Sequence, residues 1–546
     1  MLGLMAMGIL LGNPACRDFS DRPSAPATLA PLAETPTTGP HYAQSPWASV
    51  HRDSRNSDYV PMGVSADLEP AWTALEGTAL LVGPIIGPEG NLYVPSGRGV
   101  GHSHLHVFNR DGDLLWKTGA MQDLDDFDHA AVVCAPIVDA RGHVFAADLN
   151  QLWSWTAEGD LRWVVDLPDH DIQGFFVTPV FSREGHVGGV STDGRVAFFR
   201  REDGELAYPI LDLPGQAGPV SHPPPPGLWG GGLISPDFIR PLWDLTYGRA
   251  IEVANTPAVH PETGRLFITG SGEERGTGNL YGIDTSDSGL SLAFSTPMGK
   301  GSGTSPAISQ DGQRVYAIDD EGLMVAVSTE TGEPLWKADQ TMGQASPSVG
   351  PDETLYSFSG LEGTLVAIEG ESGHVKWRRQ YDAFAREHLT WLPFLGRVTT
   401  IDGLITVTDS GLFAFLDLNY EIRGGDQPYP QPRQVRVVQI DPETGDIVAS
   451  FPSPDTSGAF FVPDTEGRAY LTLSGAASSI AYYGVNPKLP SFLRVDRKPT
   501  AGLVALRRRG ERSSSVSAIL SGTTRPIGSS LTLNQTRESI LAVPDP

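Results

Sequence analysis

The stretch SPAISQDGQRVYAIDDEGLMVAVSTETGEPLW, residues 305–336, decides how the whole chain is interpreted. It contains short apolar runs that are separated by the pairs Asp311-Gly312, Glu321-Gly322 and Thr331-Gly332. Short runs of β-branched and aromatic residues between such pairs are typical of antiparallel hairpins. Glycine suits these turns because it reaches positive φ angles at little cost. The stretch therefore predicts one antiparallel sheet of four strands, which ends in the strand that carries Trp336.

The same unit recurs along the chain. A second copy runs from Ser346 to Trp377, and Gly332 and Gly373 of the last turns lie 41 residues apart. Eight units are recognised by their opening prolines, which are Pro84, Pro136, Pro179, Pro257, Pro306, Pro347, Pro393 and Pro463. A period of roughly 40 to 50 residues with four strands per unit indicates a β-propeller. The sequence predicts an all-β fold, an eight-bladed β-propeller of four-stranded antiparallel blades, with seven or nine blades as alternatives.

An isolated strand near the N-terminus bears on ring closure. Leu68 to Trp72 resembles the outer strand of a blade without the three strands that should precede it. We expect this strand to complete the last blade, because closure leaves no open sheet edge. Residues 529–533 and 539–543 resemble the first two strands of a further blade, which keeps the nine-bladed alternative open.

Residues 326–336, AVSTETGEPLW, resemble the repeat of pyrroloquinoline quinone (PQQ) enzymes, Ala-x-Asp-x-x-Thr-Gly-x-x-x-Trp, with Ser328 in place of Asp. Trp47 and residues 51–57 also resemble the segment that precedes the first blade in such proteins. The resemblance covers residues 46–510 and implies a PQQ-like propeller of the quinoprotein alcohol dehydrogenase-like superfamily. It says little about activity, since one fold hosts many functions.

Composition narrows the classes of partner. The chain of 546 residues is 40% hydrophobic and 19% charged, and its formal net charge is −26. These values are typical of a globular protein. Nucleic acid is an unfavourable partner because phosphate binding requires concentrated Lys and Arg. An anionic membrane surface is unfavourable for the same reason, so we expect membrane contact only through an N-terminal lipid anchor.

Residues 1–16 form a signal-like segment in which the apolar run of residues 1–11 precedes Cys16. This run is too short to span a bilayer, and Cys16 is a candidate for lipidation. We expect residues 17–45 to form a flexible linker and residues 46–546 to form the propeller. We therefore expect an exported protein of the bacterial envelope, periplasmic or attached to the outer membrane. Cys134, next to an opening Ala-Pro pair, predicts a buried free thiol.

Three insertions interrupt the repeats, at about residues 215–250, 419–434 and 475–500. Long loops on a rigid scaffold often carry binding residues. The aromatic residues that could form a partner surface are Trp229, Trp243, Tyr429, Tyr482 and Tyr483. An equal alternative is that these rings fold back over the apolar faces of the ring.

Two clusters suggest metal ligands, but each favours a simpler interpretation. His102, His104 and His106 alternate along one strand face, and alternate positions are nearly 7 Å apart, too far for one ion without a bend. Residues 123–128 are acidic but lack the glycine and the terminal glutamate of a calcium loop. The sequence therefore nominates no catalytic, cofactor-binding or metal-binding residue.

The resemblance implies a direct test of catalysis. PQQ dehydrogenases of this family stack the quinone on a tryptophan, often also on a disulfide of adjacent cysteines, and use Ca²⁺ and an aspartate base. The chain has only Cys16 and Cys134, which are not adjacent. We therefore expect a non-catalytic binding or assembly scaffold with a protein partner and no cofactor, similar to the propeller lipoprotein of outer-membrane barrel assembly. The alternatives are a dehydrogenase of alcohols or sugars with PQQ and Ca²⁺, and a propeller that binds polysaccharide or another ligand.

Overall fold

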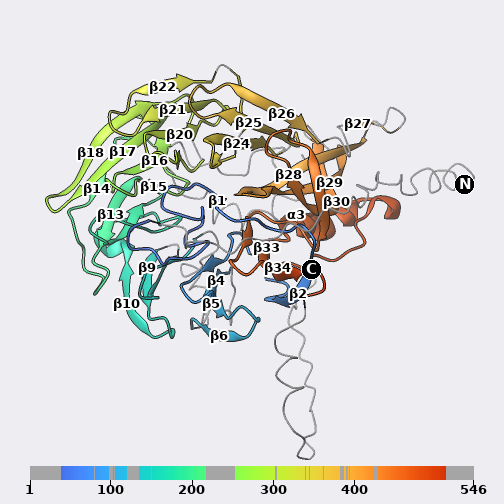
Figure 1. The fold of residues 1–546 in the computed structure, drawn as a ribbon, viewed down its shortest axis with the longest axis horizontal. Coiled ribbons are helices and arrows are strands. Elements are labelled where there is room, and N and C mark those ends of the chain that lie inside the picture. Colours follow the sequence, from blue (N-terminus) through green and yellow to red (C-terminus); the bar gives the residue numbers. More distant parts are fainter. Residues whose placement is uncertain are drawn as a thin grey trace, which may run out of the picture. The chain divides into compact units, whose positions relative to one another are not determined.

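The computed structural model describes residues 39–511 except 79, 97–102, 104, 120–133, 149, 217–251, 302–303, 339, 344, 361, 382–386, 389–391, 393 and 424–427. The chain divides into a compact unit of residues 1–508 and a second unit of residues 509–546. The first unit is an eight-bladed β-propeller (Figure 1). Its blades follow one another around the ring in chain order, from blue to red in the figure.

Blades 1 to 6 are each built from four consecutive strands. Blade 1 consists of β3 (Ile85–Ile86), β4 (Leu92–Pro95), β5 (Leu105–Phe108) and β6 (Leu114–Lys117), and blade 2 of β7 (Ile137–Val138), β8 (Val144–Ala147), β9 (Gln151–Trp155) and β10 (Leu161–Asp166). Blade 3 consists of β11 (Val180–Phe181), β12 (Val187–Val190), β13 (Arg195–Phe199) and β14 (Leu211–Asp212), and blade 4 of β15 (Ala258–Val259), β16 (Leu266–Ser271), β17 (Gly278–Ser286) and β18 (Gly289–Pro297). Blade 5 consists of β19 (Ala307–Ile308), β20 (Arg314–Ile318), β21 (Met324–Ser328) and β22 (Pro334–Lys337), and blade 6 of β23 (Ser348–Val349), β24 (Thr354–Ser359), β25 (Thr364–Glu369) and β26 (Val375–Gln380).

Blade 7 is larger than the others. Its strands are β28 (Leu395–Thr408), β29 (Gly411–Arg423), β30 (Pro428–Ile440) and β31 (Ile447–Ser453), with β1 (Tyr59–Val60) and β27 (Glu387–His388) added along β28. The register of β28 against β29 breaks between Asp402 and Thr406. Gly403, at φ +71°, lies within this break. The part of β28 after the break, residues 406–408, takes the place of the short inner strand of the other blades. The part before the break, residues 395–402, extends the sheet.

Blade 8 closes the ring with an N-terminal strand, as the sequence predicts. It consists of β32 (Phe461–Pro463), β33 (Ala469–Leu473), β34 (Gly502–Arg508) and β2 (Leu68–Ala74), which pairs antiparallel with β34. In Figure 1 the blue β2 lies beside the red β34. Pairing the two ends of the propeller in one sheet removes the open edges that a linear array of blades would leave. Residues 529–533 and 539–543 lie outside the described residues.

The opening prolines mark the inner strands in six blades, from Pro84 before β3 to Pro347 before β23. A proline at this position costs no ladder hydrogen bond, because it precedes the strand. Pro463 differs from the prediction, since it ends β32 and lies opposite Ala469. Proline is tolerated at that strand end for the same reason, so the sequence placed this unit a few residues too late. Pro393 lies outside the described residues.

The repeated glycine and tryptophan lock neighbouring blades together. The indole N–H of Trp336 in blade 5 donates to the carbonyl of Gly370 in blade 6 at 2.9 Å. The turn glycine that follows, Gly373, has φ +75°, and a Cβ there would approach the Trp336 ring to 2.7 Å. Glycine is thus needed twice, for the turn and for contact with the indole of the preceding blade. The same relation joins Trp377 to the turn at Gly445.

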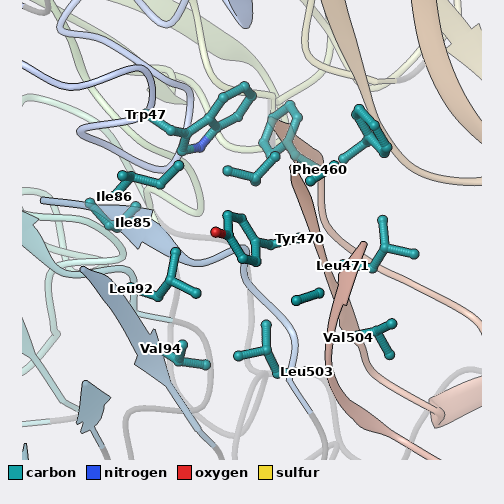
Figure 2. Packing of buried hydrophobic residues seen from close by; sticks show 14 of the residues in the cluster. Trp47, Ile85, Ile86, Leu92, Val94, Phe460, Tyr470, Leu471, Leu503 and Val504 are labelled. Atoms are coloured by element: carbon teal, nitrogen blue, oxygen red, sulfur yellow. The ribbon is translucent and has the colours of Figure 1, made fainter. Parts of the chain in front are cut away.

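Buried apolar side chains fill the spaces between blades. Figure 2 shows Ile85 and Leu92 of blade 1 facing Tyr470 and Leu503 of blade 8. Trp47, fully buried, covers the inner end of this interface. Burial of such side chains contributes about 1.5–3 kcal/mol each. The core is therefore a series of interfaces around the ring, as radial stacking requires.

The three predicted insertions have different outcomes. Residues 217–251 lie outside the described residues. Residues 419–434 form mainly the outer ends of β29 and β30, so the predicted loop is largely strand. Residues 475–500 contain α3 (Ala476–Ser479), the π-helical turn η3 (Ile480–Val485) and the 3₁₀ turns η4 (Asn486–Lys488) and η5 (Ser491–Leu493). A further 3₁₀ turn, η2 (Leu167–His170), follows β10. In the part of the chain that the structure describes, no helix has the length and apolar character required to cross a bilayer.

Candidate functional site: the axial cavity

The segment before blade 1 lies at the hub of the ring. Its backbone carbonyls accept hydrogen bonds from the inner strands of five blades, in the pairs Trp47–Ile86, Ser54–Val259, Arg55–Ile308, Ser57–Val349 and Asp58–Val407. Tyr42 and Ala43 are already buried, although the sequence predicts a linker up to residue 45. Tyr42 packs edge-on against Phe181 of blade 3 at 4.8 Å. This hub segment, residues 41–60, therefore joins blades that are far apart in sequence.

Polar side chains of the hub segment are buried in pairs. His51 Nδ1 lies 2.9 Å from Asp58 Oδ1, and the second carboxylate oxygen of Asp58 accepts a hydrogen bond from Ser348 Oγ at 2.9 Å. Burial raises the pKa of Asp58, and His51 and Ser348 offset part of that effect. The bond to Asp58 fixes the orientation of the His51 ring. His51 is also the one hub-segment side chain in the described lining of the axial cavity.

Asp53 is the second buried carboxylate of the hub segment. It accepts hydrogen bonds from Arg52 Nη1 at 2.5 Å and from Ser57 Oγ at 2.9 Å. Burial alone would raise the pKa of Asp53, but Arg52, Arg55 and Ser57 hold it below its ordinary value. This carboxylate is therefore charged and structural, because its hydrogen bonds hold the tight turns of the segment.

A cavity of about 430 Å³ occupies the axis of the ring. Its lining comes from blades 3 to 8 and from the hub segment, and the residues are His51, Val177, Ala254, Asn255, Thr256, Thr304, Ser305, Ala345, Ser346, Phe358, Ile401, Asp402, Gly403, Leu404 and Gly458. Most are small or carry hydroxyl groups, because they directly precede the inner strands, where the blades converge. Only His51 and Asp402 in this lining are titratable.

The lining hydroxyls link successive blades at the hub. Ser305 Oγ accepts from Thr256 N at 3.1 Å, and Ser346 Oγ accepts from Ser305 N at 2.9 Å. Thr256 Oγ1 in turn donates to Thr178 Oγ1 of blade 3 at 3.1 Å. Each of these residues precedes the opening proline of its blade. The hydroxyl in the repeated Ser/Thr-Pro pair is therefore a structural link between neighbouring blades.

Three carboxyl groups interact beside the cavity, those of Asp402 and Asp417 in blade 7 and of Asp455 in the connection between β31 and β32. Asp402 is opposite Phe415 and Asp417 is opposite Thr400, so the two aspartates are diagonal neighbours on one face of the sheet. Burial, together with the charge of Asp455, raises the pKa of Asp402 from 3.8 to about 7. Burial and the charges of Asp402 and Asp455 raise the pKa of Asp417 as well. Asp417 Oδ1 accepts no hydrogen bond from the described residues.

Asp402 is the group through which this cavity could do chemistry. A carboxyl group with a pKa near 7 exchanges protons readily at neutral pH and can serve as a general acid or base. Its Oδ1 accepts a hydrogen bond from the N–H of Gly403 at 3.0 Å. Perturbed pKa values are more frequent at functional sites, although structural networks also produce them.

The lining does not fit a quinone held as the family's dehydrogenases hold it. The described lining contains no tryptophan and no cysteine, and Phe358 is its one apolar ring. Nowhere in the described ranges do three or more His, Cys, Asp or Glu side chains come together in an arrangement for a metal ion. The polar side chains of the lining are hydroxyls, one carboxamide, one carboxyl group and one imidazole, which suit a small polar ligand better than a stacked aromatic cofactor.

The residues singled out in the sequence lie mostly elsewhere. Tyr483 is exposed and Tyr482 is half-buried, and neither lines the cavity. Tyr429 lies on β30 opposite Ile422. His106 is buried on β5 with its ring stacked on Phe108. Cys134 is buried and forms no disulfide among the described residues, as predicted. Trp229, Trp243, Cys16, His102, His104 and residues 123–128 lie outside the described residues.

The sequence did not reveal Asp402 or His51 as cavity residues. Four of the eight residues 51–58 are charged, which is typical of an exposed loop. The signal that could have identified His51 is the resemblance of this segment to the one that precedes the first blade in PQQ-like proteins. The aspartates of blade 7 lie on an expanded repeat, where no register with the other blades could be set.

Comparison with known families agrees with this geometry. The model of a PQQ repeat family, described as outer membrane protein assembly factor BamB, matches residues 101–379, which is more than half of the chain. The chain belongs to the PQQ-like β-propeller family. No curated protein matches its sequence.

The solved structures to which the chain is similar include two dehydrogenases and a BamB protein. A europium-containing methanol dehydrogenase is 12% identical with a TM-score of 0.55, and covers 85% of this chain and 98% of its own. Quinohemoprotein alcohol dehydrogenase from Comamonas testosteroni is 12% identical with a TM-score of 0.53, and the match covers 86% of this chain and 81% of the dehydrogenase. BamB from Moraxella catarrhalis is 13% identical with a TM-score of 0.46, covering 80% and 99%. At these identities the likeness to the two dehydrogenases concerns the fold alone.

Proposed function

We propose that this PQQ-like propeller is a non-catalytic scaffold of the bacterial envelope, which binds a protein partner. The observation that carries the proposal is that the repeated motif residues have structural roles. The tryptophans, turn glycines and Ser/Thr hydroxyls are occupied in joining blade to blade. The features that differ between blades are the long strands of blade 7 and the insertion of blade 8. The description of the matching family, an assembly factor of the outer membrane, supports the same function.

The outer strands of blades 1 and 2 are the surface that we assign to the partner. Leu114 and Leu115 on β6 are each 48% exposed, and Leu161 on β10 is 55% exposed. Trp116 of blade 1 donates its indole N–H to the carbonyl of Ala157 in blade 2, and this hydrogen bond joins the two neighbouring blades. Exposed aliphatic side chains on adjacent elements favour a protein interface.

The test is affinity capture of the tagged chain from native envelope membranes after mild crosslinking. We expect a specific partner that Leu115→Ser with Leu161→Ser no longer captures. The matched control is Leu292→Ser with Leu335→Ser, which removes exposed leucines from the outer strands of blades 4 and 5. Absence of any partner that depends on the first pair would overturn the assignment of the surface.

A quinoprotein dehydrogenase of alcohols or sugars is the second candidate function. One observation favours it, the Asp402 carboxyl group with a pKa of about 7 in the axial cavity. Dye reduction is measured after PQQ and Ca²⁺ are added to the purified chain. Turnover that Asp402→Asn removes would refute the scaffold proposal, and the scaffold predicts no turnover in either protein. The third alternative, a propeller that binds polysaccharide, would be favoured by insertion aromatics that line one open groove. Among the described residues, no insertion aromatic lines the axial cavity.

A further inference from the structure

The insertion of blade 8, residues 475–500, encloses a small hydrophobic cluster with the outer ends of β28 and β29. The buried members of this satellite core are Leu392, Leu395, Ile422, Ile480, Val485, Leu489 and Leu493. In Figure 1, α3 lies near β30 on this part of blade 7. Asp455 ties both ends of the insertion to the connection between β31 and β32, since it accepts hydrogen bonds from Ser478 Oγ at 2.5 Å and from Thr500 N at 2.6 Å. The insertion is therefore anchored on one side and presents its other side to solvent.

Exposed aromatic side chains are concentrated around the satellite core. Phe394 is 40% exposed, Tyr483 55% and Phe492 39%. Each is within two residues of a buried member of the satellite core, and so projects from its rim. Among the described residues, the other large apolar side chains of similar exposure are leucines and valines on the outer strands of blades. Two of the three exposed rings thus belong to the insertion, and Phe394 belongs to the segment directly before β28.

The same element carries the opposite charge to the chain as a whole. Residues 475–500 contain four basic residues and one acidic residue, whereas the chain has a net charge of −26. Arg494, Arg497 and Lys498 are exposed, and among the described residues none of the three forms an ion pair. Arg433 of β30 donates to the carbonyl of Arg494 at 2.6 Å, which adds a further cation to this surface.

We propose that the insertion, together with Phe394, binds the surface of an anionic lipid membrane. Aromatic side chains favour the headgroup region of a bilayer, and Lys and Arg next to them pair with lipid phosphates. The chain as a whole is acidic and is repelled by the same surface, so contact requires a locally basic element such as this one. This local charge reverses the expectation from net charge, which averages the element with the rest of the chain.

Vesicle binding of the full chain tests the proposal. Wild type is expected to sediment with vesicles of phosphatidylglycerol and phosphatidylethanolamine, and not with phosphatidylcholine vesicles. Each neutralised cation should lower the partition coefficient about fivefold, so Arg494→Gln with Arg497→Gln and Lys498→Gln should lower it about a hundredfold. Tyr483→Ser with Phe492→Ser should also weaken binding. Higher salt should weaken binding of the wild type.

The controls remove the same groups from other surfaces. Lys117→Gln with Lys300→Gln and Lys337→Gln neutralises three exposed lysines of the propeller. Binding that is absent, equal on neutral vesicles, or lowered equally by the control variant would overturn the proposal. A second measurement does not depend on the N-terminal segment. An environment-sensitive dye at Tyr483→Cys, in a Cys16→Ser background, should shift to the blue with anionic vesicles, whereas a dye at Leu335→Cys should not. An unchanged dye at position 483 would overturn the proposal as well.

Discussion

The prediction closest to the candidate site concerns Asp402→Asn. In the folded chain burial raises the pKa of Asp402 from 3.8 to about 7. The unfolded chain therefore loses the Asp402 proton near pH 4, whereas the folded chain keeps it up to about pH 7. The contribution of this group to stability is complete below pH 4, and it is lost as the pH rises towards 7. The wild type should therefore lose stability through this range, and the variant should lose less.

The size of the effect follows from the shift. A difference of one pKa unit corresponds to about 1.36 kcal/mol, so the shift of Asp402 corresponds to at most about 4 kcal/mol. Between pH 5 and pH 8 the part that is lost is about 2.5 kcal/mol. The free energy of unfolding of Asp402→Asn, minus that of the wild type, should therefore rise by about 2.5 kcal/mol over this interval. The charge of Asp402 also raises the pKa of Asp417, which acts in the same direction.

The assay is urea unfolding at several pH values, followed by tryptophan fluorescence. The matched control is Asp311→Asn, because Ser309, Gln313 and Arg314 outweigh burial and hold the pKa of Asp311 below its ordinary value. That carboxylate is ionised from pH 5 to pH 8 in both states, so the control difference should be flat. Infrared spectra at pH 6 should show a protonated carboxyl group that Asp402→Asn diminishes. A change below about 0.5 kcal/mol between pH 5 and pH 8 would show that Asp402 is ionised at pH 5 and refute the reasoning.

Three further variants test the joints between elements. Trp336→Phe removes the indole N–H that donates to Gly370, and should lower the free energy of unfolding by about 1–3 kcal/mol; an unchanged urea midpoint would contradict this role. Gly373→Ala places a Cβ about 2.7 Å from the Trp336 ring at φ +75°, and should destabilise by at least about 1 kcal/mol, whereas Gly510→Ala, with φ +81° and open space around it, controls for backbone strain alone. Asp455→Ala removes the acceptor for both ends of the insertion, and hydrogen exchange should accelerate in residues 475–500 more than in blade 5.

The ring could be predicted because its determinants are local and repeated. A turn glycine such as Gly332, an opening Pro306 and a closing Trp336 recur at nearly constant spacing, and each acts within its own blade or on the next one. A strand such as β2 could be assigned to the last blade because it lacked the strands that normally precede it. Such features depend on neighbouring sequence, which is why reading the chain in order recovers them.

The hub could not be predicted, because the hub segment makes its contacts across the whole ring. Asn56 illustrates this, since its side-chain amide donates to the carbonyls of Thr256 in blade 4 and Pro306 in blade 5, 200 and 250 residues away. In the sequence, residues 51–58 have the composition of a solvated loop, and only closure of the ring buries them. The pKa of Asp402 also depends on tertiary structure, because burial raises it and Asp455, from the connection between β31 and β32, adds to the effect. Both the segment that joins the inner strands and the titratable group of the cavity are therefore products of tertiary structure, and variants at the hub should affect blades on opposite sides of the ring together.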